Sequence, residues 1–391
     1  MKNIYVVAAK RTPIGRFQGV FKQTPAPKLG AIAVKAAIEA SGLSNTHVEE
    51  IIMGQVLTAG VGQSPARQAA LYAGLPDSVQ ALTVGKVCGS GLKAVALGAQ
   101  SIMTQDSNIV VVGGQESMSC APYILPQARD GMRMGHKEII DSMIHDGLWD
   151  PYNNLHMGNC AEFCAKEYQF SREAQDQFAK ESYLRARKAM EEGYFKNELT
   201  AVTITTGKTT QTIDSDEEPL AADLNKVEQL KPAFEKDGTI TAANASKIND
   251  GAAALVLVSE DALKKYNLKP LAKIISWAGH AQEPKWFTTA PVTAMQRALQ
   301  KANLTANEID LYEINEAFAL VTMAAMKKLE LPHNKVNIHG GACALGHPIG
   351  ASGARILTTL IHSLQQYKKR YGLATLCIGG GEGFAMIIER I

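Results

Sequence analysis

The feature of this 391-residue chain that most constrains its fold is a pattern that occurs twice. In the first half, Ser90-Gly91 begins a run of helix-forming residues that leads to an apolar strand ending at Gly113-Gly114. In the second half, Ser352-Gly353 begins a similar run, and the strand after it ends at Gly379-Gly380. Self-similarity of this kind predicts two copies of one structural unit. We therefore expect two similar α/β domains packed back to back, with reactive residues on corresponding loops; chance similarity of two glycine-rich units is the alternative.

Apolar runs and helix-forming runs alternate along most of the chain, which is typical of a parallel sheet covered on both faces. The spacing of apolar residues predicts helices over residues 27–40, 171–192, 293–302 and 317–329, and strands over residues 4–9, 51–54, 109–114, 252–258, 272–277, 373–381 and 384–388. The helix at 171–192 is bounded by a capping serine, Ser171, and by Gly193.

Composition changes after Gly114, where methionine and charged residues become more frequent and polar loops such as residues 205–218 occur. We interpret residues 119–244 as an inserted loop domain. The N-terminal α/β domain then comprises residues 1–118 plus 245–268, and the C-terminal α/β domain comprises residues 269–391.

Bulk composition excludes several classes of protein. Hydrophobic residues make up 46% of the chain and charged residues 20%, as in an ordinary α/β protein with a sizeable core. A net charge of +2 gives no reason to expect a nucleic acid or a membrane surface as partner. No apolar run approaches the roughly 18 residues that span a bilayer. The six cysteines are scattered and no leader pattern opens the chain, so we expect no disulfide framework and a cytoplasmic location.

One cysteine stands in a turn that suits a nucleophile. Cys88 lies in Val87-Cys88-Gly89-Ser90-Gly91, directly before the expected helix. The unpaired N–H groups and partial positive charge of a helix N-terminus favour a thiolate. We therefore expect the pKa of Cys88 to lie below the usual value of about 8.5. A buried structural cysteine is the alternative.

Three further turns carry chemically capable residues at strand and helix boundaries, where function is often placed. They are Asn315-Glu316-Ala317-Phe318, Gly346-His347-Pro348 and Cys377-Ile378-Gly379-Gly380-Gly381. Each has a structural alternative: a helix cap for Asn315, a loop residue for His347 and a core residue for Cys377.

Together, in this order and spacing, the four motifs resemble the thiolase family, and the resemblance extends from Arg11-Thr12-Pro13-Ile14-Gly15 to the final glycine cluster. The resemblance implies the reversible Claisen condensation of two acetyl-CoA molecules to acetoacetyl-CoA and CoA through an acyl-cysteine. It implies CoA thioesters as substrates and no resident cofactor. It also implies a homotetramer tethered through the inserted loop domain.

The resemblance assigns catalytic roles residue by residue. Cys88 would attack the thioester, and His347 would take its proton. Cys377 would remove a proton from the α-carbon of the second acetyl-CoA. Asn315 would hold a water that faces the enolate oxygen together with His347. The N–H groups of Cys88 and Gly379 would face the other oxyanion.

The same resemblance places His156, Met157 and Phe318 at the acyl pocket and Ser246 on the pantetheine arm of CoA. Apolar packing is the alternative for Met157 and Phe318. His156, Cys160 and Cys164 also fall on one helical face, but no fourth ligand with suitable spacing is evident, so we expect no metal.

Three positions depart from the family pattern. Gly85 stands where asparagine is common, three residues before the nucleophile, which affects a local hydrogen bond and not the role of the cysteine. Leu220 stands where many members have an arginine near the adenine and phosphates of CoA. Lys247 stands where glycine is common. A solvated surface lysine is the favoured interpretation of Lys247, and a phosphate contact is the alternative. Cys343 is expected to be a small buried residue without chemistry.

Three other functions remain open at this point. A degradative 3-oxoacyl-CoA thiolase would act on longer chains. A ketosynthase that uses a carrier protein would generally need a second histidine where Asn315 stands. A non-catalytic acyl-CoA-binding scaffold would bind its ligand without forming an acyl-cysteine.

Overall fold

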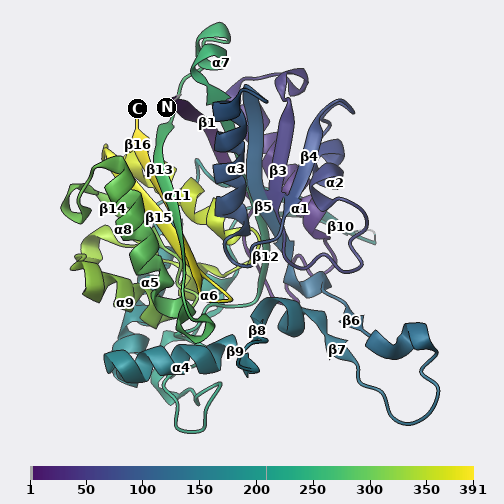
Figure 1. Ribbon diagram of the computed structural model, residues 1–391, viewed down its shortest axis with the longest axis vertical. Helices are drawn as coiled ribbons and strands as arrows, with labels where there is room; N and C mark the ends of the chain where they lie inside the picture. Colours follow the sequence, from purple (N-terminus) through teal and green to yellow (C-terminus); the bar gives the residue numbers. More distant parts are fainter. Residues whose placement is uncertain (1–2, 208) are drawn as a thin grey trace.

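A computed structural model describes residues 3–207 and 209–391 of the chain. Its frame is a large mixed sheet in which the strands of the first half and those of the second half occupy opposite ends (Figure 1). The first-half strands, in spatial order, are β4 (Gln80–Val84), β3 (Glu50–Gly54), β5 (Ile109–Ser117), β12 (Asn249–Ser259) and β1 (Ile4–Arg11). The second-half strands continue the sheet as β13 (Ala272–Ala281), β16 (Glu382–Arg390), β15 (Tyr371–Ile378) and β14 (Leu311–Ile314).

The two halves share one strand order. In each half the first strand lies at the centre of the molecule, followed outward by the last strand, the strand before it and the second strand. The two first strands, β1 and β13, pair through Tyr5 with Lys273 and Val6 with Ala272. In the second half, a bridge from Tyr312 to Val336 occupies the place that β4 has in the first. The predicted duplicated α/β fold is therefore confirmed.

Helices cover the sheet in three layers. The helices α1 (Ala26–Ser41) and α2 (Pro65–Tyr72) cover the outer face of the first half, and α8 (Ala290–Ala302) and α9 (Ala319–Leu329) cover that of the second. The helices α3 (Ser90–Thr104) and α11 (Ser352–Gln366) lie between the halves and pack against each other. The largest apolar core surrounds α3 and α11 and includes strand residues of both halves.

The starts of α3 and α11 touch at two glycines. A Cβ atom on Gly91 would lie 2.8 Å from the main-chain nitrogen of Ala354, and one on Gly353 would lie 2.3 Å from that of Leu92. Real Cβ contacts are never this short, so the absence of side chains lets the helix starts meet. The first turns of the two repeated units are thereby brought to one point.

The expectation of a parallel sheet was wrong in part. Parallel pairs join β3 to β4, β3 to β5 and β14 to β15. The central strands β12, β1, β13 and β16 pair antiparallel with their neighbours. Parallel neighbours need a long crossover, usually a helix, whereas antiparallel neighbours do not. β16 follows β15 through the short turn Gly379–Gly381, which suits an antiparallel pair, whereas β12 pairs antiparallel with β5 after the long insertion.

The segment between β5 and β12 extends away from the sheet. It contains α4 (Met157–Tyr168), α5 (Arg172–Glu191), the projecting strands β6 (Tyr123–Ile124) and β7 (Ile140–Asp141), and the pair β8 (Trp149–Asp150) and β9 (Leu155–His156) (Figure 1). The side chain of Ser171 accepts a hydrogen bond from the N–H of Ala174, as its predicted capping role requires.

The expectation of a polar loop at residues 205–218 was wrong over much of its length. β10 (Val202–Thr206) and β11 (Thr209–Ile213) form a hairpin there, and α6 (Glu218–Ala221) follows. Threonines face each other across the hairpin, with 3.2 Å between the hydroxyl oxygens of Thr205 and Thr210. Such cross-strand pairs stabilise strands whose composition is polar. The remaining short elements are β2 (Gly15–Arg16), α7 (Glu260–Lys265) and α10 (Ala342–Leu345).

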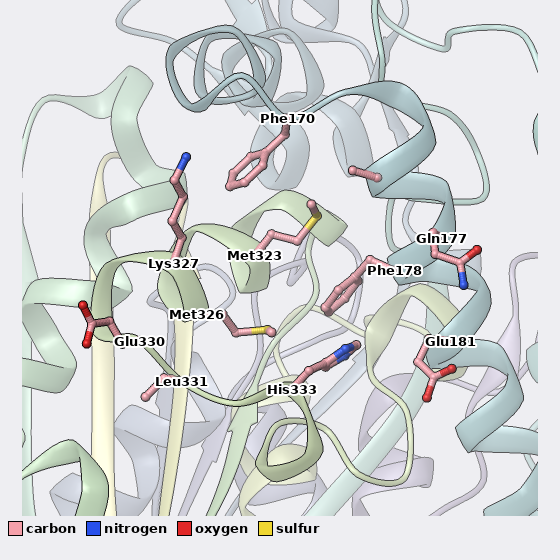
Figure 2. Close-up of a pocket in the computed structure, with 11 residues that line it drawn as sticks. Phe170, Gln177, Phe178, Glu181, Met323, Met326, Lys327, Glu330, Leu331 and His333 are labelled. Carbon is pink, nitrogen blue, oxygen red and sulfur yellow. The ribbon is translucent and has the colours of Figure 1, made fainter.

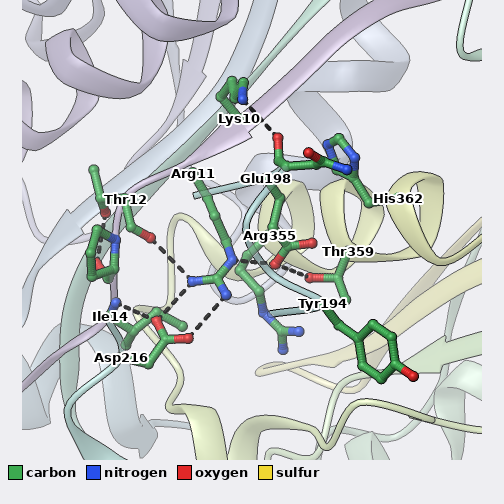
Figure 3. Close-up of polar contacts among 12 residues, drawn as sticks. Lys10, Arg11, Thr12, Ile14, Tyr194, Glu198, Asp216, Arg355, Thr359 and His362 are labelled. Carbon is green, nitrogen blue, oxygen red and sulfur yellow. Dashed lines mark hydrogen bonds and ion pairs between the residues drawn. The ribbon is translucent and has the colours of Figure 1, made fainter. Parts of the chain in front are cut away.

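A buried ionic network connects the segment between β5 and β12 to both halves of the molecule (Figure 3). Nε of Arg11, at the end of β1, lies 2.5 Å from a carboxylate oxygen of Glu198. Nη1 and Nη2 of Arg11 lie 2.7 Å and 3.0 Å from the two carboxylate oxygens of Asp216. On α11, the hydroxyl of Thr359 donates to Glu198 over 3.1 Å. Two-pronged pairing of this kind fixes orientation as well as distance.

No helix in the described part of the chain is both long and apolar enough to cross a membrane.

Candidate active site

Cys88 lies in a tight turn between β4 and α3. Val87, the residue before it, has a φ of 44°, a left-handed conformation that is a genuine outlier for a β-branched side chain. The hydroxyl of Ser90 donates to the carbonyl of Val87 over 2.7 Å and accepts from the N–H of Lys86 over 2.8 Å. These bonds hold the strained turn, and strain of this kind is often found at functional sites.

His347 occupies the corresponding place in the second half, between α10 and α11. Its ring atom Nδ1 lies 2.5 Å from the hydroxyl oxygen of Ser352, and that hydroxyl lies 2.9 Å from the carbonyl of Pro348. A hydroxyl has one proton to donate. Both contacts are hydrogen bonds only when the hydroxyl donates to Pro348 and Nδ1 donates to the hydroxyl. In that arrangement Nε2 of His347 carries no proton and can accept one.

Asn315 follows β14 and lies against the imidazole of His347. Its amide nitrogen is 3.5 Å from each ring nitrogen of His347. Its oxygen Oδ1 is buried and has no hydrogen-bond partner among the described residues. Buried polar atoms normally have a partner, so this oxygen is free to accept a hydrogen bond from a buried water.

Cys377 and Gly379 lie where β15 ends, directly against the Cys88 turn. A Cβ atom on Gly89 would lie 2.4 Å from Cδ1 of Ile378, which shows how closely the two segments approach. The main-chain N–H groups of Gly379 and of Cys88 itself are near enough to the Cys88 sulfur to lower the pKa of its thiol, against the larger effect of burial. The two thiols are close enough that the charge of Cys88 raises the pKa of Cys377, after the larger effect of burial.

Burial governs the protonation of the central pair. It raises the pKa of the Cys88 thiol to about 11, although the two N–H groups oppose the shift. Burial, reinforced by the charge of Arg355, lowers the pKa of His347 to about 3. At neutral pH the pair is therefore a thiol and a neutral imidazole. The expectation of a lowered cysteine pKa was wrong, because loss of solvent outweighs the helix N-terminus.

A cavity of about 220 Å³ opens onto these groups. Of the residues expected at the site, seven line it: Cys88, His156, Met157, Ser246, Phe318, His347 and Gly379. The other lining residues are mostly apolar and include Val87, Met118, Leu148, Phe234, Ile248, Phe287 and Ile349. Cys377 is 1% exposed and belongs to the apolar cluster that also contains Met157 and Phe318. Asn315 lies behind the wall, against His347.

The pocket-lining residues are held by the main chain. The N–H of Ser246 donates to the carbonyl of Ala317 over 2.9 Å, beside a strand-like bridge between Ala245 and Phe318. His156 caps α4, since its Nδ1 accepts from the N–H of Gly158 over 3.1 Å.

The spacing that could have suggested a metal has another explanation. Cys160 points to Asp150, with 3.7 Å between its sulfur and a carboxylate oxygen, and Cys164 packs in the apolar cluster. The ring of His156 stacks on Phe234 with 4.8 Å between centroids. Within residues 3–207 and 209–391, no three His, Cys, Asp or Glu side chains form a group that could hold a metal ion.

Lys247 differs from its expected role. Its ammonium group points inward and contacts three main-chain carbonyl oxygens, so it is not a solvated surface lysine. Leu220 is 66% exposed and does not line the site cavity. The pattern of apolar and polar residues along the sequence does not reveal that the charged side chain of Lys247 turns inward or that the apolar side chain of Leu220 is exposed.

Sequence reasoning missed Ser352 as a partner of His347, and it also missed Glu116. Glu116 is fully buried at the end of β5, and its carboxylate accepts from the N–H groups of Val56, Leu57 and Gly350 over 3.0, 3.2 and 2.9 Å. It thus joins the first half to the loop three residues after His347. The only sequence signal was an acidic residue within an apolar strand.

A second cavity, of about 710 Å³, lies between α5 and α9 (Figure 2). Apolar and aromatic side chains such as Phe170, Phe178, Met323 and Met326 line it. It contains none of the residues expected at the site, so the chemistry is concentrated in the smaller cavity.

Comparisons with known proteins agree with this geometry. Residues 4–261 match the model of the thiolase N-terminal domain, and residues 268–390 match that of the thiolase C-terminal domain. A protein of Cupriavidus necator named acetyl-CoA acetyltransferase is 51% identical over 392 residues, covering 100% of both chains. Its namesake in Pseudomonas aeruginosa is 50% identical over 392 residues, again covering 100% of both. A relative from Gibberella zeae, named as a cytosolic acetyl-CoA acetyltransferase, is 48% identical over 99% of this chain and 98% of its own. With both domain models matched in order along almost its whole length, this chain belongs to the thiolase family.

Proposed function

We propose that this protein catalyses the reversible condensation of two acetyl-CoA molecules to acetoacetyl-CoA and CoA. One observation carries the proposal: Cys88 from the first half and His347 and Gly379 from the second half open into one apolar cavity. The names of the relatives, at about half identity over the full length, support acetyl-CoA as the substrate.

In the first half-reaction, the sulfur of Cys88 attacks the thioester carbonyl of acetyl-CoA and the bond to the CoA sulfur breaks. Nε2 of His347 accepts the thiol proton and passes it to the departing CoA thiolate. The N–H groups of Cys88 and Gly379 donate to the carbonyl oxygen as it gains charge. Because the thiol and imidazole are neutral at rest, proton transfer occurs as the carbonyl is attacked. Each such donor contributes about 3 to 4 kcal/mol to lowering the barrier.

In the second half-reaction, the buried Cys377 thiol passes its proton to His347, and the thiolate so formed removes a proton from the α-carbon of a second acetyl-CoA. The carbanion attacks the acetyl-Cys88 carbonyl, the carbon–sulfur bond to Cys88 breaks, and the imidazolium of His347 returns a proton to the Cys88 sulfur. The enolate oxygen faces His347 and a water held by Asn315, whose unpartnered Oδ1 supports this role. No resident cofactor takes part, since the CoA thioesters are the substrates.

The pocket wall supports a preference for short acyl groups. Met157, Phe318 and Phe287 bring large apolar side chains to a small cavity beside the thiol. The pantetheine arm would pass Ser246, and Leu220 offers no charge to the nucleotide. A degradative thiolase of longer chains is the competing enzyme within the family.

The chain-length profile of thiolysis tests the proposal. With free CoA, we expect faster cleavage of acetoacetyl-CoA than of a ten-carbon 3-oxoacyl-CoA. A clear preference for the longer substrate overturns the acetyl assignment. Radiolabelled acetyl-CoA should also label the peptide that contains Cys88, and binding without any label would favour a non-catalytic scaffold.

We also propose a homotetramer assembled through the inserted loop domain of residues 119–244, in the cytoplasm. Large apolar side chains on the projecting arm support this assembly: Tyr123, Met134 and Ile139 are 67%, 89% and 65% exposed. The relative named as cytosolic supports the location. Light scattering after gel filtration measures the mass, and a monomer would overturn the tetramer.

A further inference from the structure

The side chain of Lys247 turns back into the protein from the edge of the site cavity. Its Nζ contacts the carbonyl oxygen of Ala242, lies 2.9 Å from that of Ala245 and 3.4 Å from that of Cys343. The ring centroid of Tyr183 lies 5.7 Å from Nζ, within reach of a cation–π contact. One ammonium group is thus surrounded by oxygen atoms and an aromatic face.

The number of acceptors indicates the protonation state. A lysine ammonium has three N–H donors, and a neutral amine has two. Three carbonyl acceptors therefore match the charged form and use every donor it has. Burial lowers the pKa of Lys247, and the carboxylates of Glu218 and Glu316 oppose that shift and favour the charged form. No donor is left for a phosphate of CoA, so the phosphate contact considered from sequence has no support.

The carbonyl groups belong to two segments with different tasks. Ala242 and Ala245 precede Ser246 in one segment, of which Ala245 and Ser246 line the substrate pocket. Cys343 lies in α10, four residues before His347, and its own N–H donates to Glu316 next to Asn315. The pocket segment and the His347 turn therefore converge on one positive charge.

We propose that Lys247 is a tethered cation, whose ammonium fills a cage of main-chain carbonyls and fixes the segment 242–246, which leads into the pocket wall, against the turn that carries His347. Rings of main-chain carbonyl oxygens bind potassium by replacing its hydration shell. In this chain the covalently attached ammonium takes the place of such an ion. Lys247 is a positioning residue in this role, because it acts through the two segments that it joins. The effect on catalysis rests on the function proposed above, whereas the cage itself does not.

The experiment compares the full-length protein with Lys247→Ala and Lys247→Met in ammonium, potassium and choline chloride at equal ionic strength. The unfolding temperature of the unchanged protein should be the same in all three salts. Lys247→Ala opens the cage, so ammonium and potassium should raise its unfolding temperature relative to choline, since a ligand that binds only the folded state stabilises it. Lys247→Met fills the space with an apolar chain and should respond to none of the salts. Lys264→Ala, at an exposed lysine, is the matched control.

Acetoacetyl-CoA thiolysis gives the second readout. In choline, kcat/KM of Lys247→Ala should fall about tenfold or more, as expected for lost hydrogen bonds to a charged group, and should recover several-fold in ammonium or potassium. Equal behaviour of Lys247→Ala in all salts, or selective stabilisation of the unchanged protein by potassium, overturns the tethered cation. If the stability response occurs but no form of the protein cleaves acetoacetyl-CoA, the cage stands and the proposed function fails.

Discussion

The hydroxyl oxygen of Ser352 lies 2.5 Å from Nδ1 of His347 and 2.9 Å from the carbonyl of Pro348, and both contacts are hydrogen bonds only when Nδ1 carries the ring proton. Ser352 begins α11, one of the two helices between the halves of the molecule. The orientation of the imidazole is thereby tied to the most buried helix layer rather than to a flexible loop.

We expect Ser352→Ala to lower turnover by about tenfold or more, because both imidazole tautomers become populated and general base catalysis is worth about 10²- to 10⁴-fold. The measurement is kcat across a range of pH, together with thermal unfolding. Ser101→Ala removes a hydroxyl hydrogen bond to Glu50 elsewhere in the fold and should leave kcat unchanged. Unchanged turnover in Ser352→Ala would show that the tautomer is set by other contacts.

The two active-site thiols should separate the half-reactions. Cys88→Ala should form no acyl-enzyme, whereas Cys377→Ala should still be acetylated at position 88 but lose condensation. Mass spectrometry of the acetylated peptide and assay of acetoacetyl-CoA report the two steps. Cys164→Ala alters a buried cysteine of the same apolar cluster and should retain both. Equal loss of both half-reactions in Cys377→Ala contradicts the division of labour.

The pH dependence of alkylation follows from the burial of Cys88. Its pKa is raised to about 11, so the thiolate fraction grows with each unit of pH from neutrality toward that value. Iodoacetamide labelling of Cys88 in the free enzyme should therefore accelerate about tenfold per pH unit between about pH 7 and 9. Quantified peptide labelling, with Cys88→Ala to assign the peptide, measures it. A rate that is already constant near neutral pH would instead indicate a resting thiolate–imidazolium pair.

Glu116→Gln should weaken the connection between the halves. The amide keeps one oxygen but places a donor against main-chain N–H groups, at a cost of about 1 to 3 kcal/mol in the free energy of unfolding. Chemical denaturation measures this loss, and kcat should fall with it because Gly350 is near His347. Glu50→Gln, whose carboxylate accepts from the hydroxyls of Ser101 and Ser107, is the matched exchange on a neighbouring strand. It should reduce kcat far less than Glu116→Gln does.

The sequence predicted the elements whose signals are local. Helix α5 has its cap at Ser171, and α1 ends where Gly42 takes a φ of 76°. The repeated pattern of Ser-Gly, helix, strand and Gly-Gly predicted the two halves, because two copies of one structural unit have their elements in the same order. The motif residues Cys88, His347 and Gly379 line one cavity, which is the arrangement that the family resemblance implied.

The remaining features depend on contacts that no local pattern records. A run of threonines forms β10 and β11 because partners across the hairpin are present. The pKa of Cys88 depends on burial by both halves, and the inward turn of Lys247 depends on carbonyls far away in sequence, such as that of Cys343. Tertiary environment decides these properties, so sequence reasoning placed the residues but not their protonation or partners.

The Arg11 network has a consequence for how the chain is made. Arg11 leaves the ribosome before Glu198 and Asp216, and Thr359 leaves it after all three. The guanidinium and the two carboxylates can pair with one another, but α11 covers them only after its own residues have been made. Until then, the face of α3 that packs against α11 stays open to water.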